Sequence, residues 1–451
     1  MKMFFAKSPE LFDRFDPKYV AFKRRSASFR YPAVTMGSLL SEPPEYGAGE
    51  AGVERENDAT PRYIRITDID ENGELLPGLG MTAAKVESQY LLRDGDLLFA
   101  RSGNTVGKCY LHDSERVDYP CFYAGYMIRF RFAEKVLPKY VFAFAQTPYY
   151  REWVSAIQRS AGQPNINAQE YRSLELPLPP LSEQRKIVAE LDAAYAAKRA
   201  ADAKATKLLA SIDNMVLNEL GIAKLPKPDT SLPSRMFTVP ASKVANATFA
   251  PDHYFDMIDF SKSKYPCERF VEHIDIDPPC GNVKITKLVS MEGVSAEWCA
   301  IEDVEDIAAD ATQGYSTFRG GDVIWARITP CMENGKSAVV EAEPSECFCG
   351  STEFLVFRPK DDMVNPYYLQ NLLHLNRFRE VAAHHFTGTS GHQRITADFF
   401  KSISIPIPPR TVQDCIASKA SSIRAEARKL KADATAALDA AKRKIEKVLV
   451  I

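Results

Sequence analysis

Each half of the chain begins with short apolar runs and ends with a long stretch that lacks proline and glycine. The short runs alternate or are continuously apolar over a few residues, which is typical of strands. Strands are expected at Tyr63–Ile66, Tyr126–Phe132, Val323–Trp325 and Phe354–Phe357. Helical stretches are expected at Pro138–Ile157 and Pro366–Ala383. This mixture predicts an α/β (α+β) fold.

Two long helices are the clearest expectation. From about Ser182 to Leu220, and again from Thr411 to the last residue, small and apolar side chains recur at alternating steps of four and three. That spacing predicts a coiled-coil seam, with many alanines that allow two helix axes to approach closely. About 39 helical residues reach roughly 58 Å, so the pair predicts a rigid strut.

An internal repeat organises these elements. Leu176–Pro180 recurs as Ile405–Pro409, and Gly95–Arg101 recurs as Gly321–Arg327. The intervening segments differ almost everywhere, so we expect two copies of one fold with different working surfaces. The expected parts are a first globular domain at 1–181, a spacer helix at 182–221, a linker at 222–234, a second globular domain at 235–410 and a second spacer helix at 411–451.

Composition narrows the class of protein. The chain has 57 Lys and Arg against 59 Asp and Glu, a net charge of −2, which excludes a uniformly basic protein but not a local basic face. No apolar run approaches the roughly 20 residues of a membrane helix, and the first residues do not resemble a signal peptide. Nine cysteines without a C-x-x-C pair indicate reduced thiols and no metal site. We therefore expect a cytoplasmic protein.

A search for catalytic motifs finds little that indicates an enzyme. Phosphate-binding loops, zinc-protease and nucleophile-elbow motifs are absent from the sequence. Asp277-Pro278-Pro279-Cys280 resembles the D-P-P-Y box of amino-methyltransferases, in which an aromatic residue stacks on a flipped base. Cysteine replaces that aromatic residue, so a proline-stiffened turn is favoured. His384, His385 and His392 form a histidine cluster, but a solvent-facing loop is favoured over a metal site there. We predict no catalytic residue and no cofactor.

Two polar, glycine-containing loops occupy matching places in each half. Arg, Asn, Gln, Lys and Ser/Thr are the side chains that read bases and hold phosphates. The candidate DNA-binding residues are Arg101, Ser102, Asn104, Lys108, Arg159, Gln163, Asn165 and Asn167 in the first half and Arg327, Thr329, Asn334, Lys336, Thr389, Gln393 and Arg394 in the second. Ordinary solvated turns are the alternative for any single loop. The duplication favours nucleic-acid binding for the set, and the family resemblance described next implies double-stranded DNA.

These residues carry a resemblance to a known family. Leu176–Val188 resembles the segment that follows a target-recognition domain in specificity subunits of type I restriction–modification enzymes. Arg93–Leu98, Gly162–Ile166 and Gly321–Ile324 are similar to weaker signatures of that family. The resemblance covers essentially the whole chain, although Val412 stands in the second copy where the first has Glu183.

The resemblance implies a division of labour. Each globular domain would be a target-recognition domain that reads one half of a split, asymmetric DNA site, and the antiparallel helices would fix the spacing. The helices would also dock two methyltransferase subunits, which carry S-adenosylmethionine and the adenine chemistry, and restriction (motor-nuclease) subunits would join afterwards. The residues expected to contact these partners are Gln184, Ile187, Leu191, Gln413 and Ile416.

Two other interpretations stay open at this point. An enzyme, either a DNA adenine methyltransferase or a fused restriction enzyme, would use the segment Asp277–Cys280. A coiled-coil scaffold without a nucleic-acid role would explain the helices but not the duplicated loops. The near-zero net charge is unusual for strong phosphate binding. We therefore expect methyltransferase partners to supply much of the DNA clamp and the isolated chain to bind DNA weakly.

Overall fold

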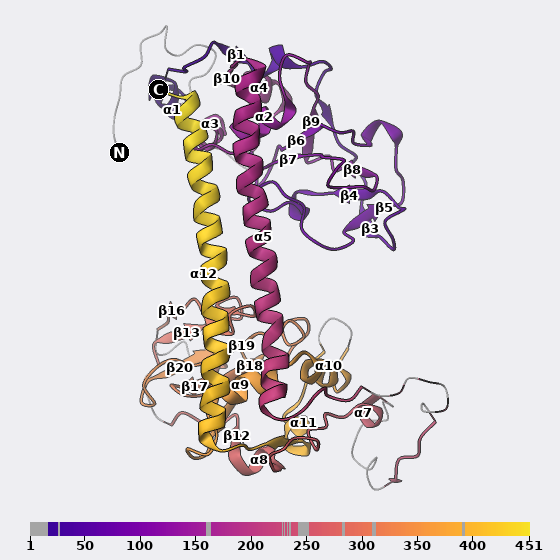
Figure 1. Cartoon of the computed structure of the whole chain (residues 1–451), viewed down its shortest axis with the longest axis vertical. Helices are drawn as coiled ribbons and strands as arrows, with labels where there is room; N and C mark the ends of the chain where they lie inside the picture. The colour runs from indigo at the N-terminus through magenta and orange to yellow at the C-terminus, as the bar shows by residue number, and fades with distance from the viewer. Residues whose placement is uncertain are drawn as a thin grey trace. The chain divides into compact units, whose positions relative to one another are not determined.

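The computed structural model divides into two compact units, shown in Figure 1. Unit 1 comprises residues 1–200 and 433–451, and unit 2 comprises residues 201–432. Each long helix therefore contributes half of its length to each unit. The structure describes residues 17–25, 28–158, 164–227, 229, 231, 233, 236–241, 252–281, 285–308, 313–389 and 393–451.

Unit 1 contains two four-stranded sheets. The first has the order β2-β9-β6-β7 and is antiparallel throughout. The second has the order β3-β5-β4-β8, in which β4 and β8 are parallel. The bounds are β2 Glu45–Tyr46, β3 Gly52–Glu54, β4 Arg62–Ile64, β5 Met81–Ala83, β6 Leu97–Ala100, β7 Cys109–Leu111, β8 Cys121–Tyr123 and β9 Met127–Phe130. Most of these strands are buried, in keeping with their short apolar runs.

Unit 2 repeats this plan. Its first sheet has the order β12-β21-β18-β19, and its second has the order β16-β13-β20-β17 with β13 and β20 parallel. The bounds are β12 Ile274–Ile276, β13 Lys287–Val289, β16 Glu305–Asp306, β17 Ser316–Arg319, β18 Val323–Ala326, β19 Ser337–Val339, β20 Cys347–Gly350 and β21 Phe354–Pro359. A hairpin of β14 (Val294–Ser295) and β15 (Ala300–Ile301) is added.

In both units the proline-containing strand pairs with the equivalent strand. In unit 1, β10 (Glu175–Pro177) pairs antiparallel with β1 (Ala33–Thr35). In unit 2, β22 (Ser404–Pro406) pairs antiparallel with β11 (Cys267–Arg269). The units differ at the edges of the second sheet, where unit 1 adds β3 beside β5 and unit 2 adds β17 beside β20. The two units therefore share a common topology.

Each expected single helical stretch is in fact two helices. The cause in unit 1 is Pro148, which cannot continue a helix; Thr147 caps the second helix by accepting a hydrogen bond from the Tyr150 amide at 3.3 Å. The shorter helices are α1 Pro17–Arg25, α2 Pro138–Phe144, α3 Pro148–Ile157, α4 Ala168–Arg172, α7 Asp252–Phe255, α8 Phe270–His273, α9 Pro366–His374, α10 Asn376–His384 and α11 Ala397–Ser402. Single 3-10 turns lie at Met36–Leu39, Ile66–Asp68 and Ser88–Tyr90.

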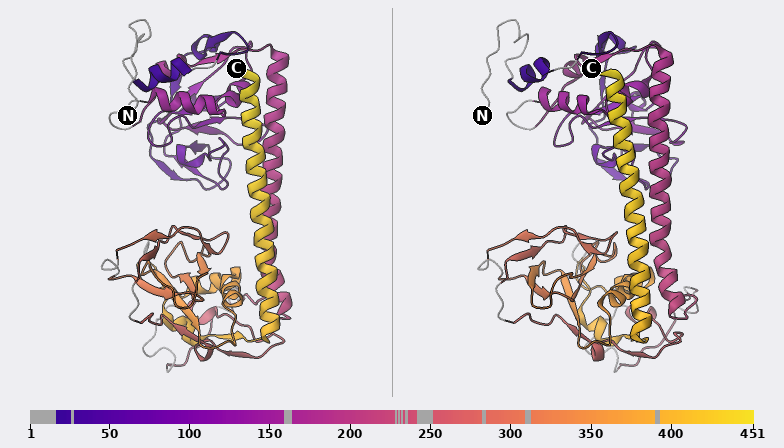
Figure 2. Two further views of the ribbon diagram at one scale, coloured as in Figure 1. Left: turned by 90° about the vertical axis from the view of Figure 1, so that its left-hand side faces the viewer. Right: turned by 60° about the vertical axis from the view of Figure 1, so that its left-hand side comes forward.

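The two long helices, α5 (Leu181–Glu219) and α12 (Arg410–Leu449), run antiparallel. In unit 1 the start of α5 packs with the end of α12, through Ile187 and Leu438 in one apolar core. In unit 2 the end of α5 packs with the start of α12, through Val216 and Ile416. Figure 2 shows the two helices side by side in both units. The predicted combination of two similar α/β domains and an antiparallel helix pair is confirmed.

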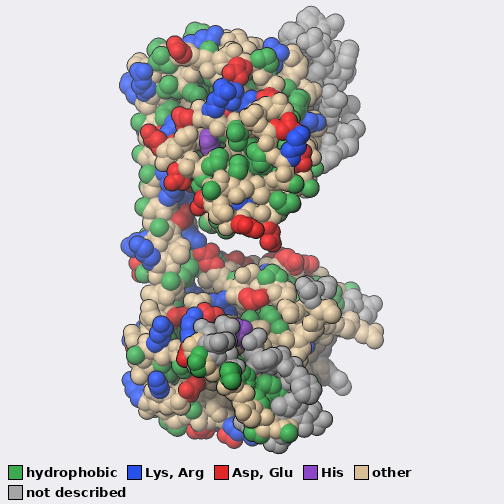
Figure 3. Space-filling model, turned by 90° about the vertical axis from the view of Figure 1, so that its right-hand side faces the viewer, with side chains coloured by type: hydrophobic (Ala, Val, Ile, Leu, Met, Phe, Trp, Pro, Cys, Tyr) green, Lys and Arg blue, Asp and Glu red, His purple; other side chains and the backbone are tan. Residues whose placement is uncertain are grey.

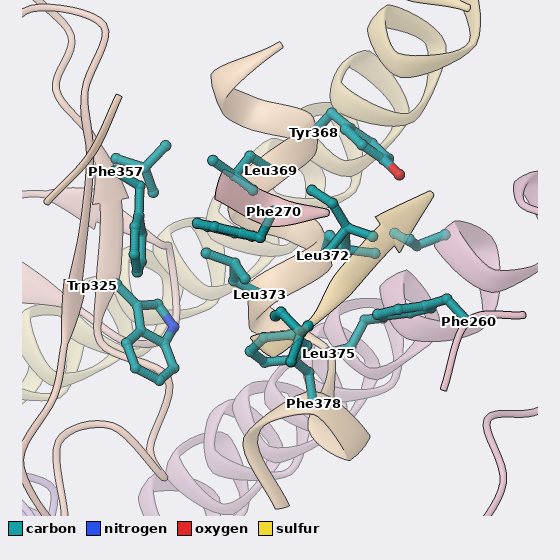
Figure 4. Close-up of a cluster of buried hydrophobic side chains, with 14 of the residues drawn as sticks. Phe260, Phe270, Trp325, Phe357, Tyr368, Leu369, Leu372, Leu373, Leu375 and Phe378 are labelled. Carbon is teal, nitrogen blue, oxygen red and sulfur yellow. The ribbon is translucent and has the colours of Figure 1, made fainter. Parts of the chain in front are cut away.

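The core of unit 2 shows how α9 fastens the sheet to the long helices. Leu369, Leu372 and Leu373 on α9 point into a cluster with Trp325 and Phe357 of the first sheet (Figure 4). Burial of apolar surface contributes about 25 cal/mol per Å², so these large side chains dominate the stability of the unit. Within the described part of the chain, no helix combines the length and the apolar character that crossing a bilayer requires.

Candidate nucleic-acid interface

The two polar loops of unit 1 are joined by their main chains. Ser102 and Asn165 form an antiparallel bridge. The Ile166 amide donates to the Arg101 carbonyl at 2.8 Å, and the Gly103 amide donates to the Pro164 carbonyl at 3.0 Å. Residues 101–104 and 164–167 therefore form one surface, which we call the two-loop junction of unit 1.

Unit 2 has the same junction, built from residues 327–330 and 393–396. Ile328 and Arg394 form the equivalent bridge. The Ile395 amide donates to the Arg327 carbonyl at 2.9 Å, and the Thr329 amide donates to the Gln393 carbonyl at 3.0 Å. Loops that lie about 60 residues apart in the sequence are thus brought together in each unit, and the pattern of bonds between them is the same.

In unit 1 the junction carries two tyrosines that the sequence analysis missed. The Arg101 guanidinium lies over the Tyr46 ring, 4.7 Å from its centroid. The Tyr46 hydroxyl accepts a hydrogen bond from the Ala168 amide at 3.2 Å, which ties it to α4. Tyr126 lies in the turn before β9 and is 65% exposed, and its carbonyl accepts a hydrogen bond from the Arg101 amide at 2.9 Å. These contacts are long-range, so no local motif reveals them.

In unit 2 the junction carries an ion pair. Arg394 Nε lies 2.9 and 2.8 Å from the two carboxylate oxygens of Glu353, and Arg394 Nη2 lies 2.6 Å from one of them. The Glu353 carbonyl accepts from the Arg327 amide at 2.8 Å, as the Tyr126 carbonyl does in unit 1. The side chains at these equivalent positions therefore differ in charge, size and chemistry.

Arg327 itself lies beside the segment that resembles a methyltransferase box. Its buried Nε has no hydrogen-bond partner among the described residues. Burial raises the pKa of the Asp277 carboxyl, while a hydrogen bond with Val356 and the Arg327 charge act in the opposite direction. Asp277 Oδ1 accepts from the Val356 amide at 2.8 Å, and its backbone has a positive φ of 51°. Asp277 therefore holds a bend against β21, and part of the expected turn, residues 282–283, lies outside the described residues.

Three of the candidate DNA-binding residues form hydrogen bonds within the chain. The Lys108 ammonium donates to the Ile69 carbonyl at 2.9 Å, and the Lys336 ammonium donates to the Met291 carbonyl at 2.6 Å. Asn167 caps α4: it accepts from the Glu170 amide at 2.9 Å, and Glu170 accepts from the Asn167 amide at 2.8 Å. These bonds hold the polar groups of Lys108, Lys336 and Asn167 against their own unit, and the contact of these three residues with DNA stays a prediction.

The remaining candidate DNA-binding residues differ in how exposed they are. Asn104, Asn334 and Thr389 are exposed, and Ser102, Asn165, Thr329 and Gln393 are partly exposed. Arg159 and Gln163 lie outside the described residues. Beside Asn104 is a hollow of about 500 Å³ that Arg151 also lines. On the face drawn in Figure 3, basic and acidic side chains are interspersed, which agrees with the balanced composition.

The two glutamines expected to contact partners are fully buried and serve as internal anchors. Gln184 Oε1 accepts from the Leu137 amide at 2.8 Å, and its Nε2 donates to the Pro179 carbonyl at 2.9 Å. Gln413 repeats this, accepting from the Asn365 amide at 2.8 Å and donating to the Pro408 carbonyl at 2.8 Å. Each glutamine thus ties the first turn of a long helix to the start of α2 or α9.

The three apolar residues expected to contact partners are also buried. Ile187 and Leu191 lie in the core of unit 1, and Ile416 lies in the core of unit 2. Together with the two glutamines, they offer almost no surface to another protein. The repeated spacing that singled out these five residues therefore marks the inward face of each helix in this chain, and their contact with partners stays a prediction.

The histidine cluster has a partner that sequence spacing did not suggest. His384 Nδ1 lies 2.8 Å from Asp256 Oδ2, and Asp256 also forms an ion pair with Arg377. His385 is buried against Phe399. His392 lies outside the described residues. Asp256 therefore works as the anchor of a charged network that holds α10.

Comparison with known proteins agrees with this arrangement. The sequence model of one protein family, the type I restriction modification DNA specificity domain, matches residues 55–206 and 280–436. Together these make up more than half of the chain. The chain is 31% identical over 140 residues to the specificity subunit of the type I restriction enzyme EcoAI of Escherichia coli, covering 31% of this chain and 24% of that protein. It is 25% identical over 222 residues to the EcoKI specificity subunit, covering 48% of this chain and 45% of that protein.

Three solved chains also resemble this one at low identity. One belongs to a study of assembly and conformational transition of a type I R-M system, with 17% identity and a TM-score of 0.47 over 93% of this chain and 98% of that chain. Another is the HsdS subunit from Thermoanaerobacter tengcongensis, with 17% identity and a TM-score of 0.35 over 93% and 95%. The third is the type I restriction-modification S subunit from M. genitalium, with 12% identity and a TM-score of 0.40 over 93% and 96%.

The fold defines a protein with two similar α/β domains and an antiparallel helix pair. The chain belongs to the type I restriction modification DNA specificity domain family. It contains two matched regions, one in each half. The chain spans about a quarter of the length of the first two curated relatives it matches.

Proposed function

We propose that this chain is the DNA sequence-specificity subunit of a type I restriction–modification complex. Unit 1 reads one half of a bipartite, asymmetric site and unit 2 reads the other half. The chain itself is non-catalytic, and a methyltransferase partner supplies the chemistry. The observation that carries the proposal is the two-loop junction, which recurs with the same main-chain bonds and different side chains.

The junction suits base recognition for physical reasons. Base edges are read by a few side chains held on a rigid frame, while phosphate contacts set the orientation of the protein. Arg101 over Tyr46, and Asn165 on the bridge, are held in this way in unit 1. Arg327 and Arg394 hold the equivalent places in unit 2. The enzyme alternative is not favoured, because both halves of the chain match a DNA specificity domain and Cys280 stands where the methyltransferase box has an aromatic residue.

The helices supply spacing and docking in this proposal. Helices of 39 and 40 residues would reach roughly 60 Å, which is the scale of two turns of duplex DNA. Two methyltransferase subunits would dock on the exposed side of the first turns of α5 and α12, since the inward side is buried. Arg185 and Lys186 are exposed there. Restriction subunits would join this assembly.

The weak overall charge leads to a further expectation. With a net charge of −2, the chain alone has few cations to spare for phosphates. We infer that the methyltransferase subunits close the clamp on DNA. Tight, site-specific binding by the purified chain without partners would contradict this part of the proposal.

The test is methylome sequencing of the host with and without this chain. Loss of one bipartite modified motif is expected on deletion, and an unchanged methylome in a host with active methyltransferase subunits would refute the proposal. Arg101→Ala should weaken use of one half-site and Arg327→Ala the other, by about 1–3 kcal/mol per lost base contact. If both variants weaken methylation of all sequences equally, the two arginines contact phosphates.

A further inference from the structure

One position of the junction carries a different side chain, with a different charge, in each unit. It is Tyr126 in unit 1 and Glu353 in unit 2. In both units the carbonyl of this residue accepts a hydrogen bond from the amide of the loop arginine, Arg101 or Arg327. The bridge residue from the second loop changes with it, from Asn165 to Arg394. Unit 1 therefore has two neutral residues, Tyr126 and Asn165, at the positions where unit 2 has the ion pair of Glu353 and Arg394.

The Glu353–Arg394 pair is held in place from two sides. The Arg394 main chain bonds to Thr387 in both directions at 2.9 Å and faces Ile328 in the bridge. Its side chain meets Glu353 along the Nε–Nη2 edge, with three contacts of 2.6–2.9 Å. Glu353 is 22% exposed and Arg394 is 36% exposed, so the pair is anchored but still reaches solvent.

We propose that Arg394 reads a guanine in the half-site of unit 2 and that Glu353 is the residue that positions it. A guanidinium has five N–H donors, and its planar fork matches the O6 and N7 acceptors of guanine. A carboxylate along one edge fixes the plane of that fork before DNA arrives. The inference rests on the proposed function and names the chemistry of the unit 2 half-site.

Unit 1 provides the contrast that the inference requires. Asn165 occupies the bridge position of Arg394, and an amide there matches the N6 and N7 atoms of adenine. Tyr126, 65% exposed, replaces Glu353 and offers no carboxylate to orient an arginine. The same frame therefore selects adenine in one half-site and guanine in the other.

The experiment uses the whole chain in complex with its methyltransferase subunits on a library of randomised sites. Arg394→Lys keeps the charge and loses the fork, and Glu353→Gln keeps the shape and loses the charge. We expect Arg394→Lys to reduce the preference for guanine at one position of one half-site by about tenfold. Glu353→Gln should relax the same position by a smaller factor. The other half-site and the spacer should not change, which also shows that the variants fold.

The matched controls are Asn165→Ala and Lys401→Ala. Asn165→Ala should relax one position of the other half-site, and Lys401→Ala, which breaks an exposed ion pair with Asp398, should leave the motif as it is. Methylation lowered uniformly by Arg394→Lys, or no shift with Glu353→Gln, would overturn the inference while the bipartite motif stands. A wild-type complex that modifies no bipartite motif would overturn the proposed function and the inference with it.

Discussion

The two units keep the same polar skeleton inside and differ at the junction outside. In unit 1, Asp96 binds Arg131 Nε at 2.7 Å and Nη2 at 3.0 Å. In unit 2, Asp322 binds Arg358 Nε and Nη2, both at 2.7 Å. Each aspartate also accepts a backbone amide three residues earlier, from Arg93 or from Arg319. A bidentate pair of this kind specifies one arrangement of strands, because a half-satisfied version is costly.

A second shared pair fixes the proline strand. The Tyr140 hydroxyl donates to the Pro177 carbonyl at 2.5 Å, and the Tyr368 hydroxyl donates to the Pro406 carbonyl at 2.8 Å. Against this constant interior, the exposed junction changes from Tyr126 and Asn165 to another set of side chains. The comparison teaches that the frame sets the position of a side chain while its identity differs between the units, as the proposed recognition of two different half-sites requires.

The largest expected effect comes from breaking the shared ion pair. Asp322→Ala removes the buried carboxylate partner of Arg358, and Asp96→Ala removes that of Arg131, which keeps a second ion pair with Glu42 at 3.0 Å. Loss of one partner of a buried pair typically costs about 3–5 kcal/mol of unfolding free energy, and the arginines here are 13% and 14% exposed. We therefore expect a loss of about 3 kcal/mol for Asp322→Ala, and a smaller loss for Asp96→Ala, when the full chain is unfolded in urea.

An exposed ion pair supplies the control for this prediction. Lys401→Ala removes the exposed pair with Asp398 and should cost less than about 1 kcal/mol. If one aspartate variant is as mild as this control, then the two interiors are not equivalent. The comparison between the units would then hold for topology only.

Much of this frame could be predicted from the sequence. Gly95–Arg101 and Gly321–Arg327 include the two aspartates, so the repeat located both pairs without identifying the arginines. Helices over 182–221 and 411–451 were expected, and α5 and α12 occupy Leu181–Glu219 and Arg410–Leu449. Local periodicity and capping determine such elements, which is why they are visible in one dimension.

The junction could be predicted only in part. Loop composition singled out Arg101 and Arg394, but their neighbours, Tyr46 at the end of β2 and Glu353 in the turn before β21, carry no local signal. The same limit applies to Lys108, whose contact with DNA stays a prediction. The sequence did not suggest that its ammonium donates to the Ile69 carbonyl, 39 positions earlier in the chain. Side-chain roles that depend on long-range packing need the fold.

The buried glutamines give an intermediate effect. Gln184→Ala and Gln413→Ala each leave a backbone amide and a proline carbonyl without a partner inside the protein. An unsatisfied buried group costs about 1–3 kcal/mol, so both variants should lose about 2 kcal/mol of unfolding free energy. Gln169→Ala, an exposed glutamine in α4, should change it little. Unequal losses at the two anchors would sharpen the difference between the units.

The smallest expected effect on stability comes from a helix position that carries a lysine in unit 1 and an aspartate in unit 2. Lys442 on α12 is 2% exposed in unit 1, where its Nζ donates to Asn72 Oδ1 at 2.8 Å. The repeat places Asp213 on α5 at the matching turn in unit 2, where it accepts from the Asn376 amide at 2.8 Å. Burial lowers the pKa of Lys442 and raises the pKa of Asp213, so in both cases the charged form is disfavoured.

The two pKa shifts predict opposite dependences of stability on pH. Between its folded and unfolded pKa values, Asp213 binds more protons in the folded chain, so stability falls as pH rises through that acidic window. Lys442 binds fewer protons in the folded chain, so stability rises with pH through its alkaline window. Asp213→Asn should therefore stabilise the chain at pH 7 by less than the glutamine variants destabilise it, and bring no gain below the unfolded pKa of about 4. Lys442→Met should flatten only the alkaline slope, and Lys444→Met, on an exposed lysine of the same helix, should leave both slopes unchanged. Urea unfolding from pH 3 to pH 10 measures these slopes, and a gain from Asp213→Asn that persists at pH 3 would mean that packing rather than charge distinguishes the two positions.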